Sequence, residues 1–262
     1  QLRGRIDLVE GDITREGLGL SAVPREVSEI YHLAAIYDLS VSRDLAMRVN
    51  VEGTRNVLRL ARKLPSLRRL QYVSTCYVSG RYDGIFREDQ LEEGQRFNNF
   101  YEETKYLAEV EVQHAAREGL PVTIYRPAIV VGDCETGETQ KYDGPYFVIQ
   151  WLVRQPRVAI MPVVGDTRRT VVNVVPRDFI VRAISWLGSL EGSAGKVYQL
   201  ADPQPLSVHD MLDVLETARQ PRSTVVSPER WPEDGWRRRY LEVTSRNRAE
   251  LARLGAACRN SS

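Results

Sequence analysis

The stretch YEETKYLAEVEVQHAAREGLPVTIYR, residues 101–126, decides the fold. It predicts a helix from Tyr101 to Glu118 and then a strand at Val122–Arg126. A strand at Leu70–Ser74, LQYVS, comes before this stretch, so the local order is strand, helix, strand. Such alternation predicts parallel strands joined by right-handed crossovers, which gives an α/β fold with a doubly wound parallel sheet. Ligands of these sheets bind at the carboxyl ends of the strands.

The same alternation extends toward both ends of the chain. Short apolar runs predict strands at residues 5–9 and 29–33, and apolar residues at helical spacing predict a helix over 42–64. After Pro127 the rhythm breaks at a loop rich in glycine and acidic residues, GDCETGETQKYDGP. Further strands are predicted at 158–164, 170–175 and 196–200, and further helices at 146–153, 177–187 and 208–219.

The pattern divides the chain into two parts. A sheet domain takes residues 1–131, with 170–200 returning to it. A smaller, interleaved C-terminal lobe for the substrate takes residues 132–169 and 201–262. The lobe contains the apolar runs YFVIQWLV (146–153) and VAIMPVV (158–164), which favour an acyl substrate, although core packing would produce the same runs.

Charge and cysteine content exclude several classes of function. The 262 residues include 36 basic and 35 acidic ones, so the net charge of +1 gives no field that would steer the protein to nucleic acid. A transmembrane segment needs about 18 apolar residues in a row, and no apolar run in the sequence is that long. Cys76, Cys134 and Cys258 lack metal-ligand spacing, which predicts a cytoplasmic protein without disulfides or a metal site.

The segment RWPEDGWRRRY, 230–240, fits a solvated surface or a peripheral membrane contact.

Tyr101 and Lys105 form the first chemical signal. Residues four apart lie on one face of a helix, so both side chains can project into the same cleft. A phenol with a pKa of about 10 exchanges protons poorly at neutral pH, but an adjacent ammonium stabilises the phenolate and lowers that pKa. The pair can then act as a catalytic acid, although the spacing also arises by chance.

Small and polar residues follow the predicted strands. Ser74 and Thr75 come at the end of LQYVS, where a hydroxyl can reach a substrate oxygen. Ala34 and Ala35 would let a flat ligand approach the backbone, and ordinary packing explains them equally well. Asp12 and Asn50 are two further candidates, and each has a local explanation that is as good. Asp12 can accept a hydrogen bond from an exocyclic amine, or it can form a turn. Asn50 lies in the predicted helix.

In order and spacing, these fragments resemble the extended short-chain dehydrogenase/reductase family over residues 5–200. Within it they look most like the fatty acyl-CoA reductase and carrier-protein thioester reductase branch, of the male-sterility type. The resemblance implies a Rossmann-type sheet and an NAD(P)H-dependent oxidoreductase. The motifs that carry it are VSTCYVSG (73–80), NNFYEETKYLAE (98–109), YRPAIVVGDCETGETQKYDGPYF (125–147) and VVNVVPRDFI (171–180).

The resemblance also implies roles for individual residues. Tyr101 would be the general acid, and Lys105 would lower its pKa and bind the nicotinamide ribose. Thr75 would hydrogen-bond the reacting oxygen, with Ser74 as the alternative, and Asn50 would support a proton relay through the lysine. NADP(H) is the favoured cofactor and NAD(H) the alternative. Besides Tyr101 and Lys105, its contacts would be Asp12 and Ile13 beside the adenine, Leu33, Ala34 and Ala35 at the end of the strand at 29–33, and Pro127, Ala128 and Ile129 beside the nicotinamide.

The chain departs from the family at its start. The family's G-x-x-G-x-x-G loop follows the first strand and holds the pyrophosphate at a helix N-terminus, and the 18 glycines of this chain never form it. The second strand, which distinguishes NAD from NADP, is not recognisable either. We therefore expect a truncated chain that binds cofactor poorly as it stands.

The resemblance implies that the parent enzyme reduces an acyl thioester, bound to coenzyme A or to a carrier protein, to an aldehyde or an alcohol. A nucleotide-sugar epimerase or dehydratase of the same family is one alternative. A truncated, non-catalytic scaffold or binding module is the other. The sequence leaves the acyl chain and the oligomeric state open.

Overall fold

The computed structural model describes residues 6–23, 25–38, 40–142, 144–153 and 166–219. These fall into two compact units. The first unit runs from the start of the described chain to Ala128 and takes up Arg182–Ala201 again. The second unit comprises the described parts of Ile129–Val181 and those from Asp202 onward.

A four-stranded parallel sheet forms the centre of the first unit. Tyr72 in the second strand lies opposite His32 on one side and Ile124 on the other, which fixes the register. The strands follow the order β1-β2-β3-β7. Their bounds are β1 (Glu29–His32), β2 (Arg69–Val73), β3 (Val122–Pro127) and β7 (Val197–Leu200). The predicted α/β class with a parallel sheet is confirmed.

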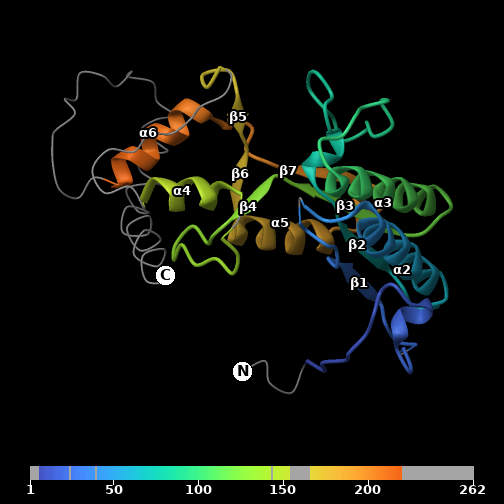
Figure 1. Cartoon of the computed structure of the whole chain (residues 1–262). Helices are drawn as coiled ribbons and strands as arrows, with labels where there is room; N and C mark the ends of the chain where they lie inside the picture. Colours follow the sequence, from blue (N-terminus) through green and yellow to red (C-terminus); the bar gives the residue numbers. More distant parts are fainter. Residues whose placement is uncertain (1–5, 24, 39, 143, 154–165, 220–262) are drawn as a thin grey trace. The chain divides into compact units, whose positions relative to one another are not determined.

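Two helices pack against one face of this sheet because apolar side chains alternate along its strands. Leu70 and Tyr72 of β2 join Val122 and Ile124 of β3 in one buried cluster with apolar residues of α2 and α3. Figure 1 shows α2 and α3 side by side along the sheet. The two helices are α2 (Gly53–Arg62) and α3 (Phe100–Arg117), and the short helix α1 (Arg43–Ala46) contacts α3.

The second half of α5 (Arg177–Ser189) covers the opposite face. Gln71, which alternates with the apolar residues of β2, donates from Nε2 to the main-chain oxygen of Gly188 at 3.4 Å. Tyr125 donates from Oη to Gln71 Oε1 at 2.8 Å. A Cβ at Gly188 would lie 2.8 Å from Gln71 Nε2, so glycine permits the close approach of helix and sheet.

The start of α3 is fixed by its N-cap. Asn99 accepts from the main-chain N–H of Glu102 through Oδ1 at 2.9 Å, and the carboxylate of Glu102 complements the helix dipole. The helix ends before Gly119, whose φ of 96° ends the regular backbone. These signals place Tyr101 and Lys105 in the first two turns.

The helix predicted over 42–64 contains an irregular turn. Met47–Glu52 is π-helical and lies between α1 and α2, and Asn50 and Val51 within it are buried. Such π-helical turns occur frequently at functional sites. The turn carries one of the predicted site residues, Asn50, and hydrophobic periodicity gave no indication of it.

The strand predicted at 5–9 is a wrong prediction for the described residues, 6–9. Residues 6–12 have no regular structure, and Ile6, Leu8 and Val9 are 69%, 99% and 63% exposed. A strand needs a neighbouring strand to satisfy its N–H and C=O groups. None of the described strands pairs with this segment, so its apolar side chains meet solvent.

The second unit is built around two short pairs of strands. β4 (Ile129–Val131) runs parallel to β6 (Val174–Pro176), and β5 (Val171–Val172) runs antiparallel to β8 (Leu206–Ser207). In the described part of this unit the helices are α4 (Pro145–Val153), α6 (Val208–Arg219) and the start of α5. Residues 170–181, predicted to return to the sheet domain, lie in this unit because β5 and β6 pair within it.

Two predicted features, the strand at 158–164 and the segment 230–240, lie outside the described residues. No helix in the described part of the chain is both long and apolar enough to cross a membrane. Short 3-10 turns occur at Glu16–Gly19, Cys76–Ser79 and Glu191–Ser193.

Candidate active site

Two buried hydroxyls lie at the carboxyl end of β2. Ser74 and Thr75 follow the strand directly and are 4% and 5% exposed. The N–H of Ser74 donates to the Tyr125 carbonyl at 2.7 Å, which extends the pairing with β3 by one residue. Thr75 accepts from the N–H of Tyr77 through Oγ1 at 3.3 Å and caps the 3-10 turn Cys76–Ser79. The fold therefore fixes both hydroxyls where ligands of parallel sheets bind.

Tyr101 lies in the first turn of α3 and is buried. Its side chain lies near Thr75, and the Tyr37 ring packs edge-on against its ring at a centroid distance of 4.9 Å. Burial raises the pKa of Tyr101 and outweighs the polar influence of Thr75, which lowers it. Tyr101 is therefore a neutral phenol at physiological pH, the form that can donate to an oxyanion.

Lys105 lies one turn further along α3 and is buried. Its Nζ donates to the Val73 carbonyl at 2.9 Å and to Tyr72 Oη at 3.2 Å, and it lies 4.7 Å from the centroid of the Tyr72 ring. Burial lowers the pKa of Lys105 to about 8, against the charge of Glu109, which raises it. The ammonium is thus mostly charged at neutral pH. Its effect on the pKa of Tyr101 stays a prediction.

Asn50 connects the segment after β1 to α3. Its Oδ1 accepts from the N–H of Ile36 at 2.8 Å, and its Nδ2 donates to the Ile36 carbonyl at 3.3 Å and to Thr104 Oγ1 at 3.0 Å. Thr104 directly precedes Lys105, so one amide joins the chain after β1 to the helix of the Tyr–Lys pair. Asn50 therefore cross-links two chain segments through hydrogen bonds. Its part in a proton relay stays a prediction.

His32, the last residue of β1, forms a second buried chain of hydrogen bonds. Thr54 Oγ1 donates to the Asn50 carbonyl at 2.6 Å, so it accepts from His32 Nε2 at 3.0 Å, and we assign the imidazole proton to Nε2. Burial, followed by the charge of Lys105, lowers the pKa of His32 to about 4. The imidazole beside the site is therefore neutral at physiological pH.

The residues predicted to flank the adenine lie in a turn near the start of the described chain. Asp12 accepts through Oδ1 from the Thr14 hydroxyl at 2.7 Å and the Thr14 N–H at 2.9 Å, and these bonds lower the pKa of Asp12. Ile13 packs against the core, and its carbonyl accepts from Asn56 Nδ2 at 2.8 Å. The turn explains both residues locally, and a contact with adenine stays a prediction.

The remaining cofactor candidates follow the ends of β1 and β3. Leu33 and Ala34 are exposed and Ala35 is partly buried, so the backbone after β1 is open to a ligand. Pro127 and Ala128 are buried at the end of β3, which runs parallel to β2, so they share the sheet edge with Thr75. Ile129 belongs to the second unit and is not placed relative to the others.

The residues of the first unit fit the sugar and backbone contacts of a nicotinamide cofactor. The Lys105 ammonium has three hydrogens, and its two hydrogen bonds leave one for a hydroxyl oxygen. Ala34 and Ala35 carry only methyl groups, so a flat ligand can approach their backbone closely. Within the described ranges, no three or more His, Cys, Asp or Glu side chains gather as metal ligands.

A buried ion pair beside the site was missed from the sequence. Arg126 and Glu109 are both 0% exposed, with Nη2 and Oε1 2.7 Å apart. Two signals could have revealed it. Glu109 lies one turn after Lys105 on the same helix face, and Arg126 is a charge inside a buried strand, where an unpaired charge is costly. The contact of the Tyr72 hydroxyl with Lys105 was missed as well, because no motif assigns a role to Tyr72.

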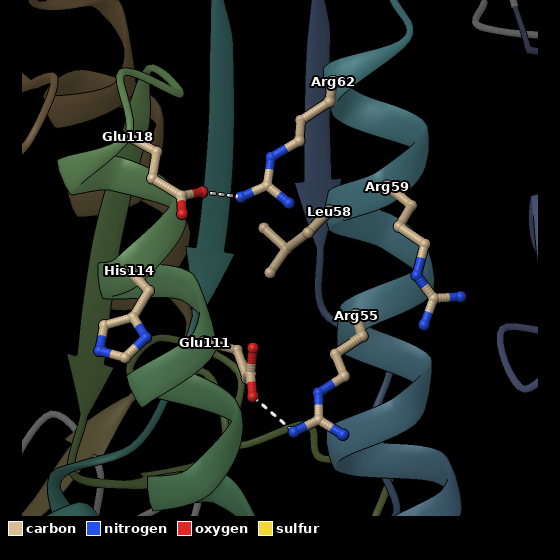
Figure 2. Close-up of a pocket in the computed structure, with 7 residues that line it drawn as sticks. All are labelled: Arg55, Leu58, Arg59, Arg62, Glu111, His114 and Glu118. Atoms are coloured by element: carbon tan, nitrogen blue, oxygen red, sulfur yellow. Dashed lines mark hydrogen bonds and ion pairs between the residues drawn. The ribbon is translucent and has the colours of Figure 1, made fainter.

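A polar hollow between α2 and α3 contains none of the predicted site residues. Figure 2 shows Arg55 and Arg62 of α2 reaching across to Glu111 and Glu118 of α3, and both contacts are ion pairs. The rest of its lining is Leu58, Arg59 and His114. Two of its guanidinium groups are already paired with carboxylates, so the hollow is a groove between two helices joined by ion pairs. It gives no support for an anion site.

The sequence is similar to that of known reductases. Residues 1–184 match the family described as Male sterility protein, an NAD-binding domain. Fatty acyl-CoA reductase wat of Drosophila melanogaster is 29% identical over 212 residues, which cover 70% of this chain and 41% of that protein. The chain spans less than half the length of the first curated relatives it matches.

Many solved structures share the fold, among them the following two. The terminal R domain from the myxalamid PKS-NRPS biosynthetic pathway has a TM-score of 0.73 and 31% identity, and the match covers 82% of this chain and 55% of that one. A thiolation-reductase di-domain from an archaeal non-ribosomal peptide synthetase has a TM-score of 0.67 and 23% identity, with 95% and 65% covered. The second likeness is evidence of the fold alone.

Proposed function

The chain belongs to the Male sterility protein family, and on this premise we propose that it reduces acyl thioesters with a nicotinamide cofactor. One observation carries the proposal. Thr75 lies beside Tyr101 at the carboxyl end of β2, close enough to lower the pKa of Tyr101, and Lys105 lies one turn along the same helix as Tyr101. All three side chains are buried, and a dry, preorganised set of donors is what stabilises a developing oxyanion.

The chemistry needs one hydride and one proton. A nicotinamide cofactor, when bound, would supply the hydride to the carbonyl carbon. Tyr101 and Thr75 donate hydrogen bonds to the carbonyl oxygen as negative charge builds on it. Because its pKa is raised, Tyr101 keeps its proton until that charge develops. Cleavage of the carbon–sulfur bond, with the proton passing to the sulfur, then gives an aldehyde and a thiol.

Lys105 and Asn50 support these steps. The Lys105 ammonium places a positive charge beside the reacting groups, and its remaining hydrogen would bind a ribose hydroxyl. Asn50 holds both main-chain groups of Ile36, which fixes the segment along which Ala34 and Ala35 lie. Tyr101 and Thr75 are thus hydrogen-bond donors to the carbonyl oxygen, whereas Lys105 and Asn50 position the cofactor and the segment that contacts it.

We propose a carrier-protein thioester as the substrate, with an acyl-coenzyme A as the alternative. The R domain at 31% identity, which comes from a PKS-NRPS pathway, supports the carrier. The fly relative named a fatty acyl-CoA reductase supports the coenzyme A alternative. NADP(H) is the cofactor we propose, and NAD(H) is the competing choice.

Cofactor binding tests this proposal first. Nicotinamide fluorescence would be measured with NADPH and NADH, on this chain and on the product of the whole reading frame that contains it. We expect NADPH to bind with the lower Kd to at least one of the two proteins. Binding of neither cofactor to either protein would favour the scaffold alternative. Turnover of a nucleotide sugar in place of a thioester would favour the epimerase alternative.

A further inference from the structure

A buried ion pair joins α3, which carries Tyr101 and Lys105, to the strand β3. Glu109 lies on α3, one turn after Lys105, and Arg126 lies on β3. Arg126 donates from Nη2 and Nε to Glu109 Oε1 at 2.7 and 3.0 Å. The second carboxylate oxygen, Oε2, accepts from the hydroxyl of Ser74, which directly precedes Thr75. The pair therefore connects the chain segment of Thr75 to the helix face of Lys105.

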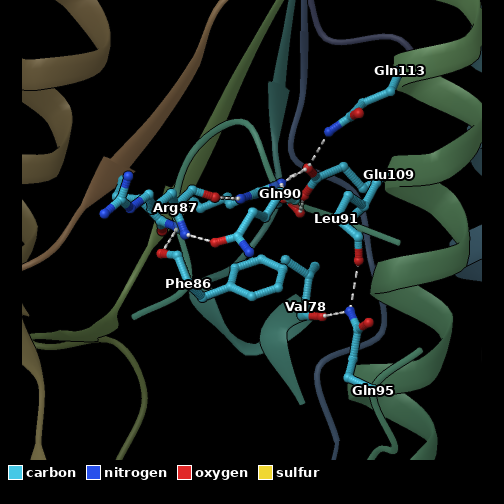
Figure 3. A network of polar contacts seen from close by, with 11 residues as sticks. Val78, Phe86, Arg87, Gln90, Leu91, Gln95, Glu109 and Gln113 are labelled. Atoms are coloured by element: carbon cyan, nitrogen blue, oxygen red, sulfur yellow. Dashed lines mark hydrogen bonds and ion pairs between the residues drawn. The ribbon is translucent and has the colours of Figure 1, made fainter. Parts of the chain in front are cut away.

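The same guanidinium holds the loop between β2 and α3. Arg126 donates from Nη1 to the Arg87 carbonyl at 3.1 Å and from Nη2 to the Gln90 carbonyl at 2.8 Å. Figure 3 shows Glu109 and Gln113 on α3 facing this loop. Gln113 donates from Nε2 to Glu109 Oε1 at 3.1 Å. Four chain segments therefore meet at one fully buried carboxylate and one fully buried guanidinium.

Stability alone does not account for such a pair. Removing two charges from water is costly, and apolar residues of similar volume often stabilise a protein as well or better. What apolar residues lack is direction, because hydrogen bonds fix distances and angles. An active site depends on that precision, since a misplacement of about 1 Å can cost about 100-fold in rate.

We propose that Glu109 and Arg126 are positioning residues, whose ion pair holds the segment of Thr75 in register with α3. This inference rests on the proposed reductase function. It assigns neither residue a contact with substrate. It follows that the distance and orientation of the Thr75 hydroxyl relative to Tyr101 and Lys105 depend on the hydrogen bonds of Glu109, one helical turn beyond Lys105.

The charge of Glu109 gives the inference a measurable signature. The titratable groups around Lys105 are Tyr72 from β2, His32 from β1, and Tyr101 and Glu109 from α3. Glu109 is the carboxylate among them, and its charge raises the pKa of Lys105 against the effect of burial. Loss of that charge should therefore move the pKa of Lys105 below about 8.

Two variants and one control test the inference. Glu109→Gln removes the charge, and the double variant Glu109→Gln/Arg126→Gln removes both charges while keeping amide groups that can hydrogen-bond. The control is Glu111→Gln, the same change two residues along α3 at the partly exposed pair with Arg55. The titration of Lys105 would be followed by NMR of carbon-13-labelled lysine, assigned by comparison with Lys105→Arg, and kcat and unfolding would be measured beside it.

We expect the Lys105 titration to move to lower pH in Glu109→Gln and to stay in place in Glu111→Gln. We also expect the double variant to fold and yet to lose at least tenfold in kcat. An unchanged Lys105 titration, or full kcat in the double variant, would overturn the inference. So would loss of folding in both variants, because the pair would then serve stability alone. The NMR titration needs no turnover, so an inactive wild type would count against the proposed function only.

Discussion

Lys105 donates from Nζ to the main-chain oxygen of Val73 at 2.9 Å, so α3 is tied to the last residue of β2. Thr75 lies two residues beyond Val73, and Tyr101 lies one turn before Lys105. One hydrogen bond therefore helps to set the distance between the helix of the proposed acid and the strand end of its partner. A change at Lys105 alters geometry as well as charge, so its variants require a structural readout beside a kinetic one.

Tyr101→Phe should lower kcat by about 100-fold or more, because general acid catalysis contributes about 10² to 10⁴ in rate. The ring and its edge-on contact with Tyr37 are kept, so thermal unfolding should change little. Tyr106→Phe, on the next turn of the same helix, is the matched control and should keep its activity. Wild-type activity in Tyr101→Phe would remove this residue from the mechanism.

Lys105→Met should raise the free energy of unfolding at pH 7. Folding lowers the pKa of Lys105 from 10.5 to about 8, so the buried ammonium destabilises the folded state below that pH by about 3 kcal/mol. The two lost hydrogen bonds offset about 1 kcal/mol each. Wild-type stability recovers as pH rises from 8 to 10.5, so the advantage of methionine should shrink there. Denaturant unfolding at both ends of this range measures it, and an advantage that grows with pH would refute the burial argument.

His32→Gln should make the protein less sensitive to acid. The folded state lowers the pKa of His32 from 6.5 to about 4, so the unfolded state takes up a proton first as pH falls through this window. Wild type should lose about 3 kcal/mol of unfolding free energy between those values through this residue, and the variant should not. His114→Gln, on an exposed part of α3, is the control. Parallel pH curves for wild type and His32→Gln would contradict the prediction.

Asn50→Ala should weaken NADPH binding, because it frees both main-chain groups of Ile36 next to Ala35. Leaving polar groups unsatisfied costs about 1–3 kcal/mol, which corresponds to about fivefold to 140-fold in Kd if the segment contacts the cofactor. Fluorescence titration gives the Kd, and denaturant unfolding separates this effect from a general loss of stability. A destabilised protein with an unchanged Kd would show that the segment after β1 does not contact the cofactor.

The regular part of the fold could be predicted from sequence, and the reason lies in local signals. The helix predicted at 101–118 is α3, Phe100–Arg117, because Asn99 and Gly119 are strong terminal signals. Prediction of the segment 5–9 as a strand was wrong because strand formation depends on a neighbour that no local pattern reveals. The π-helical turn at Met47–Glu52 was equally invisible, since its apolar spacing resembles that of an α-helix.

The site could be predicted only where a motif names its residues. The spacing of Tyr101 and Lys105 placed both on one helix face, and the structure places Thr75 close enough to Tyr101 to lower the pKa of that phenol. The contacts of Lys105 with Tyr72 and Val73 were not predictable, because they join residues about 30 positions apart through the register of strand and helix. Roles toward cofactor and substrate remain predictions for the experiments above.

The central claim is that the Thr75, Tyr101 and Lys105 set reduces a thioester, and thiol release tests it most directly. An acyl-coenzyme A and an acyl-carrier-protein thioester would each be incubated with the protein, with and without NADPH, and the freed thiol measured beside an aldehyde trap. We predict NADPH-dependent thiol release matched by aldehyde or alcohol, and its loss in Tyr101→Phe. Thiol release without NADPH, or equal release by Tyr101→Phe, would contradict the account.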